Sequence, residues 1–453
     1  MNTARIRSEL VQLGRLAAPV VVSQLSQVGM GFTDTVMAGR LGAADLAAIA
    51  IGSTLWLPVY LGCLGILMAQ SPLVAGSYGA GRFDQIRVWF GQGLWMALAL
   101  AIVGGVATWH LPAAMPMIGI DPTIAPTITG YLHAVAWGMP GACVYLAMRF
   151  VSEGVGNTRP MMYIQLGALA ANVGGNYVFM FGALGVPAMG AVGAGWSTAI
   201  VMWINALAML GVVVLDGRLQ PCRPLDRSCL PEIRRLLTLL RVGVPIALTT
   251  LMEVGMFAAV TLLMGSLGTT AVAGHQVALN YAALVFMVPL GLSLATTVRV
   301  GHARGRGDPD GARLAGLTGI AVSTGFMCLS AVIMLAAPGP IVAIYTDDPA
   351  VSAMAVSLLF IAAVFQVFDG LQVSVLGALR GLKDTAWPMA ITFVAYWLVG
   401  LPLAYVLGIS RAFGPRGLWL GLVAGLLTAG VLLSLRFRRL TRARGDRGAQ
   451  GVA

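Results

Sequence analysis

Long apolar stretches, separated by short polar connections, run through almost the whole chain. A membrane-spanning helix needs about 20 apolar residues, and stretches of that length recur often enough to predict twelve of them. They are expected at residues 14–38, 48–75, 88–110, 126–149, 161–182, 191–214, 236–264, 272–299, 313–336, 351–378, 387–408 and 416–436. The pattern therefore predicts an all-α polytopic membrane protein.

Composition and charge agree with this prediction. Of the 453 residues, 58% are hydrophobic and only 10% are charged, which excludes a soluble globular protein. We attribute the net charge of +11 to basic residues that flank the spans on the cytoplasmic side, and not to a nucleic-acid partner. If both termini are cytoplasmic, only Arg40, Arg411 and Arg416 fall outside, and the other 25 of the 28 basic residues fall inside. We expect a multi-pass protein of the bacterial inner membrane with both termini cytoplasmic.

The two halves of the chain carry matching residues at a constant sequence offset. A shift of 226 residues superposes glycine, proline and arginine positions, which match by chance less readily than leucine or alanine. The matches include Arg15 with Arg241, Pro19 with Pro245, Val28-Gly29-Met30 with Val254-Gly255-Met256, and Gly39 with Gly265. Six spans per half make the repeats parallel, which predicts two pseudo-symmetric six-helix bundles around a central cleft.

The expected domains follow from this repeat. The N-terminal bundle is predicted at 1–215, and a cytoplasmic linker with the start of the seventh helix at 216–241. The C-terminal bundle is predicted at 242–437, followed by a basic cytoplasmic tail at 438–453.

Three carboxylates, Asp34, Glu253 and Asp369, fall inside the predicted spans. Each ionised side chain would cost about 2.5–3.5 kcal/mol at the centre of a bilayer. We therefore expect the three carboxylates to face a cavity or to bind a ligand. Counted from the basic flanks, Glu253 and Asp369 lie at a similar depth and form a candidate pair, and Asp34 lies in the outer half of the first span.

Residues with amide or hydroxyl side chains also occur within the predicted spans, at spacings that place several of them on one helix face. Gln27 shares a helix face with Asp34, Asn172 and Asn176 are four residues apart, and Thr198 lies in the next span. Gln276 and Asn280 form a similar pair in the eighth span. The alternative interpretation is that such side chains only join helices through hydrogen bonds.

Arginines fall only at or near the ends of the predicted spans, so no Lys or Arg in the span interiors neutralises the carboxylates. A proton or Na⁺ would neutralise the same charge, and either ion could compete with an organic cation, which is the basis of antiport. Lys383 is the only lysine, and it belongs to no phosphate-binding loop. ATP hydrolysis, other enzymatic chemistry and a bound cofactor are therefore not expected. The five cysteines are scattered and are expected to be free thiols.

Several segments together resemble the multidrug and toxic compound extrusion (MATE) family, in its NorM-like bacterial branch. The resemblance runs almost end to end and rests on five segments. They are QVGMGFTDTVMAG from Gln27 to Gly39, Glu253-Val-Gly, AGHQVALN from Ala273 to Asn280, Asp347-Asp-Pro-Ala350, and FQVFDG from Phe365 to Gly370.

The resemblance implies an efflux antiporter that exchanges cationic or amphipathic compounds for Na⁺ or H⁺. It implies one cation-coupling site at Asp34, Asn172, Asn176 and Thr198, and a second at Glu253 and Asp369, which would hold the metal if the ion is Na⁺. Substrate contacts are expected at Gln27, Gln276, Asn280, Asp348, Phe286 and Phe365. Relatives can carry tyrosine at position 365, and its loss here weakens the case for Na⁺.

Two other expectations complete this picture. We expect a monomer in the lipid bilayer. A lipid-linked precursor flippase of related architecture is the alternative function, but it should offer basic residues within the membrane, and none is evident.

Overall fold

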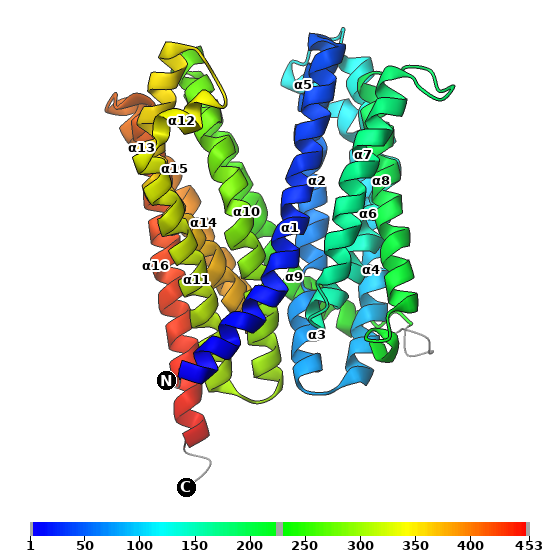
Figure 1. The fold of residues 1–453 in the computed structure, drawn as a ribbon, viewed down its shortest axis with the longest axis vertical. Coiled ribbons are helices and arrows are strands. Elements are labelled where there is room, and N and C mark those ends of the chain that lie inside the picture. The colour runs from blue at the N-terminus through cyan, green and yellow to red at the C-terminus, as the bar shows by residue number, and fades with distance from the viewer. Residues whose placement is uncertain (1–2, 223–229, 450–453) are drawn as a thin grey trace. The chain divides into compact units, whose positions relative to one another are not determined.

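The computed structural model describes residues 3–222 and 230–449, and these are almost entirely helical. Figure 1 shows the helices running lengthwise within each of two compact units, Val22–Ala247 and Met1–Val21 with Leu248–Ala453. The long helices are α1 (Thr3–Leu41), α2 (Ala43–Leu67), α4 (Phe83–His110), α6 (Ala125–Gly154), α7 (Arg159–Phe181), α8 (Ala191–Leu215), α9 (Ile233–Gly265), α10 (Thr269–Gly305), α11 (Pro309–Ala336), α13 (Pro349–Gly381) and α16 (Gly414–Ala449).

Ten of the described helical segments are long and apolar enough to cross a membrane. The two other long helices that match predicted spans are α1 and α7, whose apolar character is diluted by residues such as Gln24, Asp34, Asn172 and Asn176. Each of the twelve predicted spans therefore corresponds to a helical segment of the structure. The prediction of an all-α membrane fold is confirmed.

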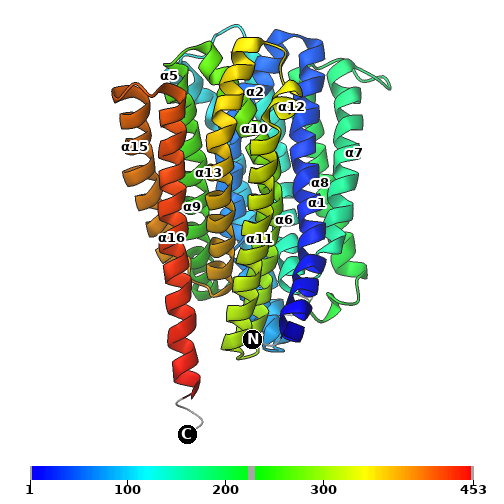
Figure 2. The same ribbon diagram turned by 60° about the vertical axis from the view of Figure 1, so that its left-hand side comes forward.

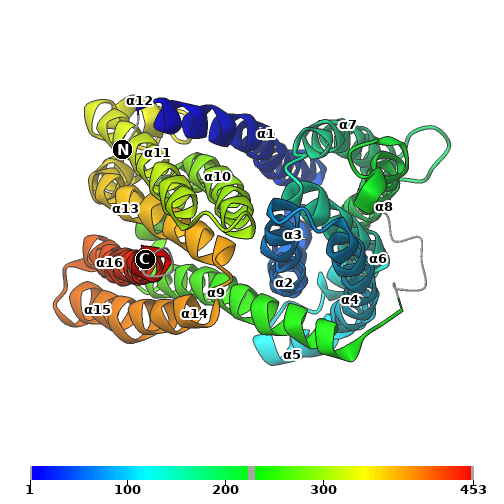
Figure 3. The ribbon, with the colours of Figure 1, turned by 90° about the horizontal axis from the view of Figure 1, so that it is seen from below.

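Within Val22–Ala247, α6 lies at the centre and packs against α8, α4, α2 and the short helix α3 (Gln70–Gly79) (Figure 3). Small residues let α6 and α8 approach closely. A Cβ added to Gly195 would lie 2.8 Å from the Tyr131 carbonyl oxygen, and one added to Gly138 would lie 2.8 Å from the Ala199 Cα. Such close backbones are typical of membrane helix interfaces, and they fix the positions of side chains on both helices.

In the other unit, α13 is the central helix and packs against α10, α11 and α16 (Figure 2). Ser293 and Thr297 of α10 donate hydrogen bonds to the Val373 and Gly377 carbonyls of α13, at 2.6 and 2.8 Å. The short helix α12 (Pro338–Ala343) precedes α13. The first part of α1 belongs here, held by two hydrogen bonds of 2.8 and 2.6 Å from Arg299 to Glu9.

The segment expected at 387–408 is not a regular α-helix. It consists of α14 (Ala386–Phe393), a π-helical stretch η4 (Val394–Gly400), α15 (Leu401–Tyr405) and a second π-helical stretch η5 (Val406–Ser410). Both π-helical stretches pack on α16. Wide turns of this type occur often at functional sites, and η4 places Tyr396 in the protein interior.

Two of the helices that extend beyond the predicted spans carry a buried arginine, and this corrects the expectation that no basic residue lies within the spans. Helix α6 continues to Gly154, so Arg149 and Glu153 are fully inside a helix and buried. Helix α13 continues to Gly381, so Arg380 is also buried within a helix. The domain boundaries predicted at 215 and 242 stay predictions, and residues 223–229 and 450–453 lie outside the described part.

Candidate cation and substrate sites

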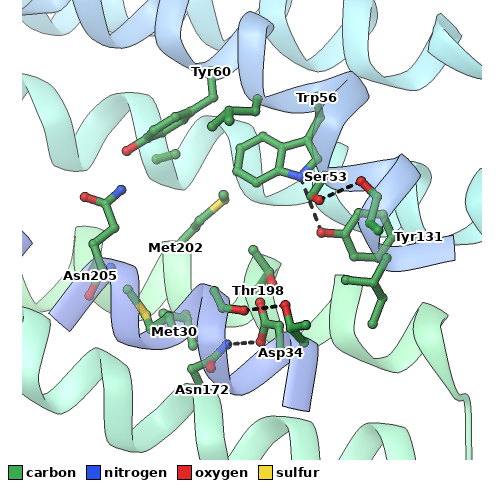
Figure 4. Close-up of a pocket in the computed structure, with 18 of the residues that line it drawn as sticks. Met30, Asp34, Ser53, Trp56, Tyr60, Tyr131, Asn172, Thr198, Met202 and Asn205 are labelled. Carbon is green, nitrogen blue, oxygen red and sulfur yellow. Dashed lines mark hydrogen bonds between the residues drawn. The ribbon is translucent and has the colours of Figure 1, made fainter. Parts of the chain in front are cut away.

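The unit Val22–Ala247 contains a pocket of about 310 Å³, a volume in the range of small-molecule sites. Its wall comes from α1, α2, α6, α7 and α8 (Figure 4). Asp34 is the only charged residue in this wall. The pocket therefore favours an occupant with apolar surface and a positive charge.

Asp34 is held by two amides from α7. Asn172 and Asn176 each donate an Nδ2 hydrogen bond to Asp34 Oδ1, at 3.1 and 2.6 Å. The two asparagines are buried and lie one helical turn apart, which explains why both reach the same oxygen. Thr198 and Gln27 line the same pocket. The structure thus brings together all four residues expected around Asp34.

Four aromatic side chains, those of Trp56, Tyr60, Tyr131 and Tyr145, contribute to the pocket wall, a feature that the sequence analysis missed. Trp56 and Tyr60 lie one turn apart on α2, with ring centroids 5.5 Å apart. The Trp56 indole donates a hydrogen bond of 3.3 Å to the Tyr131 hydroxyl of α6. Figure 4 shows Trp56 and Tyr60 across the pocket from Asp34. The four-residue spacing of Trp56 and Tyr60 was the signal available in the sequence.

A buried ion pair lies next to this pocket in the same unit. Arg149 Nε donates a hydrogen bond of 2.7 Å to Glu153 Oε1, and Arg149 Nη2 donates one of 3.2 Å to Gln24. The Arg149 charge interacts with the pocket residues Tyr60 and Tyr145. Because Arg149 pairs with Glu153, its charge is balanced locally, and Asp34 is the charged residue of the pocket wall itself.

The second pair of expected acids lies in the other unit. Asp369 of α13 is buried, and Glu253 of α9 is half-buried. The two carboxylates are close enough to interact electrostatically. Oδ1 of Asp369 is buried without a hydrogen-bond partner, as is the Tyr396 hydroxyl. Polar atoms of this kind require an ion, a proton or water to satisfy them.

Phe365 belongs to an aromatic cluster. Its ring packs edge-on against Phe257, with centroids 5.9 Å apart, and against Trp419, at 5.3 Å. Trp419 Nε1 donates a hydrogen bond of 3.2 Å to His275 Nδ1, and the other ring nitrogen pairs with Thr261 at 3.0 Å. Because Nδ1 accepts, the buried imidazole is neutral.

The remaining expected substrate residues belong to the other unit, Met1–Val21 with Leu248–Ala453. Gln276 and Asn280 are exposed on α10, and Phe286 is half-buried on the same helix. Asp348 caps α13, because its Oδ1 accepts hydrogen bonds from the Ala350 and Val351 backbone amides at 2.7 and 3.1 Å. Their assignment to substrate contacts stays a prediction.

Four of the five cysteines lie in the described part of the chain. Cys63, Cys143, Cys222 and Cys328 are free thiols, and Cys229 lies outside the described residues. Burial raises the pKa of the Cys222 thiol to about 11. Among the described residues, no group of three or more His, Cys, Asp or Glu side chains is placed to hold a metal ion. A Na⁺ site at Glu253 and Asp369 would need further oxygen ligands.

Ionic and amide groups held inside bundles of apolar helices are typical of polytopic membrane transport proteins. Comparison with known proteins then identifies the family. The model of the MatE family matches residues 19–178 and again residues 245–406. The chain belongs to this family. The two matches begin 226 residues apart, which confirms the duplication predicted from the sequence.

Curated relatives and solved structures agree with this assignment. The chain is 42% identical to the multidrug resistance protein PmpM of Pseudomonas aeruginosa, over 97% of this chain and 93% of that protein. It is 43% identical to the probable multidrug resistance protein NorM of Xanthomonas campestris, over 97% and 96%. The crystal structure of the eukaryotic MATE transporter AtDTX14 shares the fold, with a TM-score of 0.87 at 19% identity and coverage of 98% and 99%.

Proposed function

We propose that this protein is a multidrug efflux transporter, a secondary antiporter that exports cationic or amphipathic compounds in exchange for Na⁺ or H⁺. The observation that carries the proposal is the pocket of about 310 Å³ in which Asp34 is the single charged residue among aromatic and apolar side chains. Relatives named as multidrug resistance proteins, at 42% and 43% identity, support the same function.

The pocket accounts for broad specificity. An aromatic cation gains electrostatic attraction from Asp34 and cation–π and stacking contacts from Trp56, Tyr60 and Tyr131. None of these contacts demands one substrate shape. Met30 and Met202 add adaptable apolar surface to the wall. A lipid-linked pyrophosphate would meet no basic side chain in this wall, so the pocket does not favour the flippase alternative.

Antiport requires that the coupling ion and the exported compound compete for binding to the protein's carboxylates. Asp34 can bind either the cation to be exported or the coupling ion, and Asp369 with Glu253 offers a second ion site. Each ion must bind the two transport conformations with different affinities for coupling to occur. The proposal leaves the choice between Na⁺ and H⁺ to experiment.

Purified full-length protein in liposomes provides the test. Accumulation of tetraphenylphosphonium is measured with an imposed Na⁺ gradient, an imposed pH gradient, or neither. We expect accumulation that requires one of the two gradients and that falls sharply in Asp34→Asn and Asp369→Asn variants that still fold. Gradient-independent accumulation, or undiminished transport in both variants, would refute the proposal.

A further inference from the structure

The pocket in Val22–Ala247 has polar side chains at two levels. Three of its helices each contribute two polar residues that are seven positions apart in the sequence. The pairs are Gln27 and Asp34 on α1, Gln165 and Asn172 on α7, and Thr198 and Asn205 on α8. Seven residues make almost two turns of an α-helix, so the two members of a pair share a helix face and lie about 10 Å apart along the helix axis.

Hydrogen bonds connect residues of the same level. Asn172 of α7 donates a hydrogen bond of 3.1 Å to Asp34 of α1, and these two residues with Thr198 form what we call the charged level. Asn205 Nδ2 of α8 donates a hydrogen bond of 3.5 Å to Gln165 Oε1 of α7. The neutral level comprises Gln27, Gln165 and Asn205. Figure 4 shows Asn205 in the pocket at a place apart from Asp34.

The hydrogen bonding of Asn205 is incomplete. Its side chain is buried, with 7% of the residue exposed, and its Oδ1 has no hydrogen-bond partner among the described residues. The hydrogen bond of 3.5 Å to Gln165 is longer than the usual N–H···O distance of about 2.7–3.2 Å. A buried amide oxygen costs free energy until another group satisfies it. Because Asn205 lies in the pocket wall, a bound compound can supply that group.

The alternative role for Asn205 is to join α7 and α8, as amides often do between membrane helices. Other residues already perform this role. Ser197 of α8 donates a hydrogen bond of 3.3 Å to the Asn172 carbonyl of α7. A Cβ added to Gly175 of α7 would lie 2.5 Å from the Ser197 Oγ, which shows how closely the two helices pack. The side chain of Asn205 is therefore available for binding a ligand.

The two levels select a compound with two different ends. Asp34 attracts the positive charge at one end, and the aromatic side chains of the wall contact the apolar part. Asn205 requires a neutral hydrogen-bonding group at the other end. A primary amide or a hydroxyl both donates and accepts hydrogen bonds, so it matches an asparagine side chain in either orientation.

We propose that Asn205, supported by Gln165, is a specificity-determining subsite for amphipathic cations that carry a neutral amide or hydroxyl group about 10 Å from the positive charge. The proposal rests on the efflux function proposed above and narrows its substrate class. Cations without such a group bind through Asp34 alone. They leave the Asn205 oxygen unpaired and therefore gain less from binding.

Calorimetric titration of purified full-length protein with two matched cations tests the proposal. Both cations are triphenylphosphonium compounds. One carries an octyl chain, and the other carries a heptyl chain that ends in a primary amide. Asn205→Leu should weaken binding of the amide compound about two- to tenfold, the value of one neutral hydrogen bond, and should not weaken binding of the octyl compound. Gln12→Leu, at an exposed position of α1, is the matched control and should change neither affinity.

A shorter compound tests the distance between the two levels. Triphenylphosphonium with an ethyl chain that ends in a primary amide cannot reach from Asp34 to Asn205, so Asn205→Leu should leave its affinity unchanged. Asn205→Ala removes the same amide with a smaller side chain and should reproduce the selective loss for the long amide compound. This second variant separates the loss of the hydrogen bond from the steric fit of leucine.

The ratio of the dissociation constants of the two long compounds decides the outcome. An unchanged ratio in folded Asn205→Leu and Asn205→Ala proteins would overturn the proposal, as would an equal loss for the short amide compound. Asp34→Asn should weaken all three cations alike. Failure of that expectation would contradict the proposed efflux site instead, so the two failures are distinguishable.

Discussion

Replacing Asp34 with asparagine isolates the contribution of one charge to substrate binding. The side chains have nearly the same shape, and an asparagine oxygen can still accept the Asn172 and Asn176 hydrogen bonds that Asp34 Oδ1 receives at 3.1 and 2.6 Å. The amide network and the helix positions should therefore persist. The change removes a negative charge from a pocket wall that contains no other charged residue.

The magnitude follows from Coulomb's law. Two unit charges 4 Å apart interact by about 1 kcal/mol in bulk water and about 4 kcal/mol at the effective dielectric constant near a protein surface. A pocket with largely apolar walls lies closer to the second value. Because about 1.4 kcal/mol corresponds to a factor of ten, we expect Asp34→Asn to raise the dissociation constant of a monovalent aromatic cation about 100-fold or more.

Calorimetric titration with two ligands of similar shape measures this effect. Tetraphenylphosphonium carries a charge, and triphenylphosphine oxide does not. Asp34→Asn should weaken binding of the first and leave the second within about twofold, since only the charge term changes. The exposed Asp121→Asn serves as the matched control and should alter neither. Equal weakening of both ligands would mean that Asp34 maintains the shape of the pocket rather than its charge preference.

Three further outcomes are expected. Gly195→Leu should abolish the yield of folded protein, because its Cβ would lie 2.8 Å from the Tyr131 carbonyl oxygen. Gly211→Leu on the same helix meets open space and should fold. Size-exclusion profiles of the two purified variants measure the difference. Trp56→Leu should weaken tetraphenylphosphonium binding about 2- to 30-fold by loss of a cation–π contact, as measured by the same titration. Cys222 should resist maleimide at pH 8 and react faster as the pH approaches its pKa of about 11, followed by mass spectrometry. Since that pKa is raised by folding, its contribution to stability is present below the ordinary thiol pKa of 9.0 and disappears as the pH rises through 11.

The fold and part of the first site could be predicted because they depend on local pattern. Apolar length located the spans, and the four-residue spacing of Asn172 and Asn176 placed both amides on one helix face. The structure adds that this face meets Asp34 of α1. The sequence could not supply the aromatic wall, because which faces of α2 and α6 meet at a pocket depends on tertiary packing.

Buried arginines were missed for a different reason. Hydropathy windows end where the first basic residue occurs, so Arg149 and Arg380 were assigned to membrane-flanking positions. Helices α6 and α13 continue past them to Gly154 and Gly381, and packing against neighbouring helices removes both side chains from solvent. Arg149 forms an ion pair with Glu153, one turn along the same helix. Arg380 lies within electrostatic range of Glu253, which belongs to a different helix.

The duplication clarifies how the two halves diverged. A shift of 226 residues places Gln27 on Glu253 and Asp34 on Val260, so each half keeps one acid on its first helix, but at positions two turns apart. In the first half, two amides support the acid, and the nearby arginine is cancelled by Glu153. In the second half, Glu253 interacts electrostatically with a second carboxylate, that of the buried Asp369 on α13. Different residues therefore place carboxylates inside the helix bundle of each half, and a carboxylate is the group that a site needs in order to exchange one monovalent cation for another.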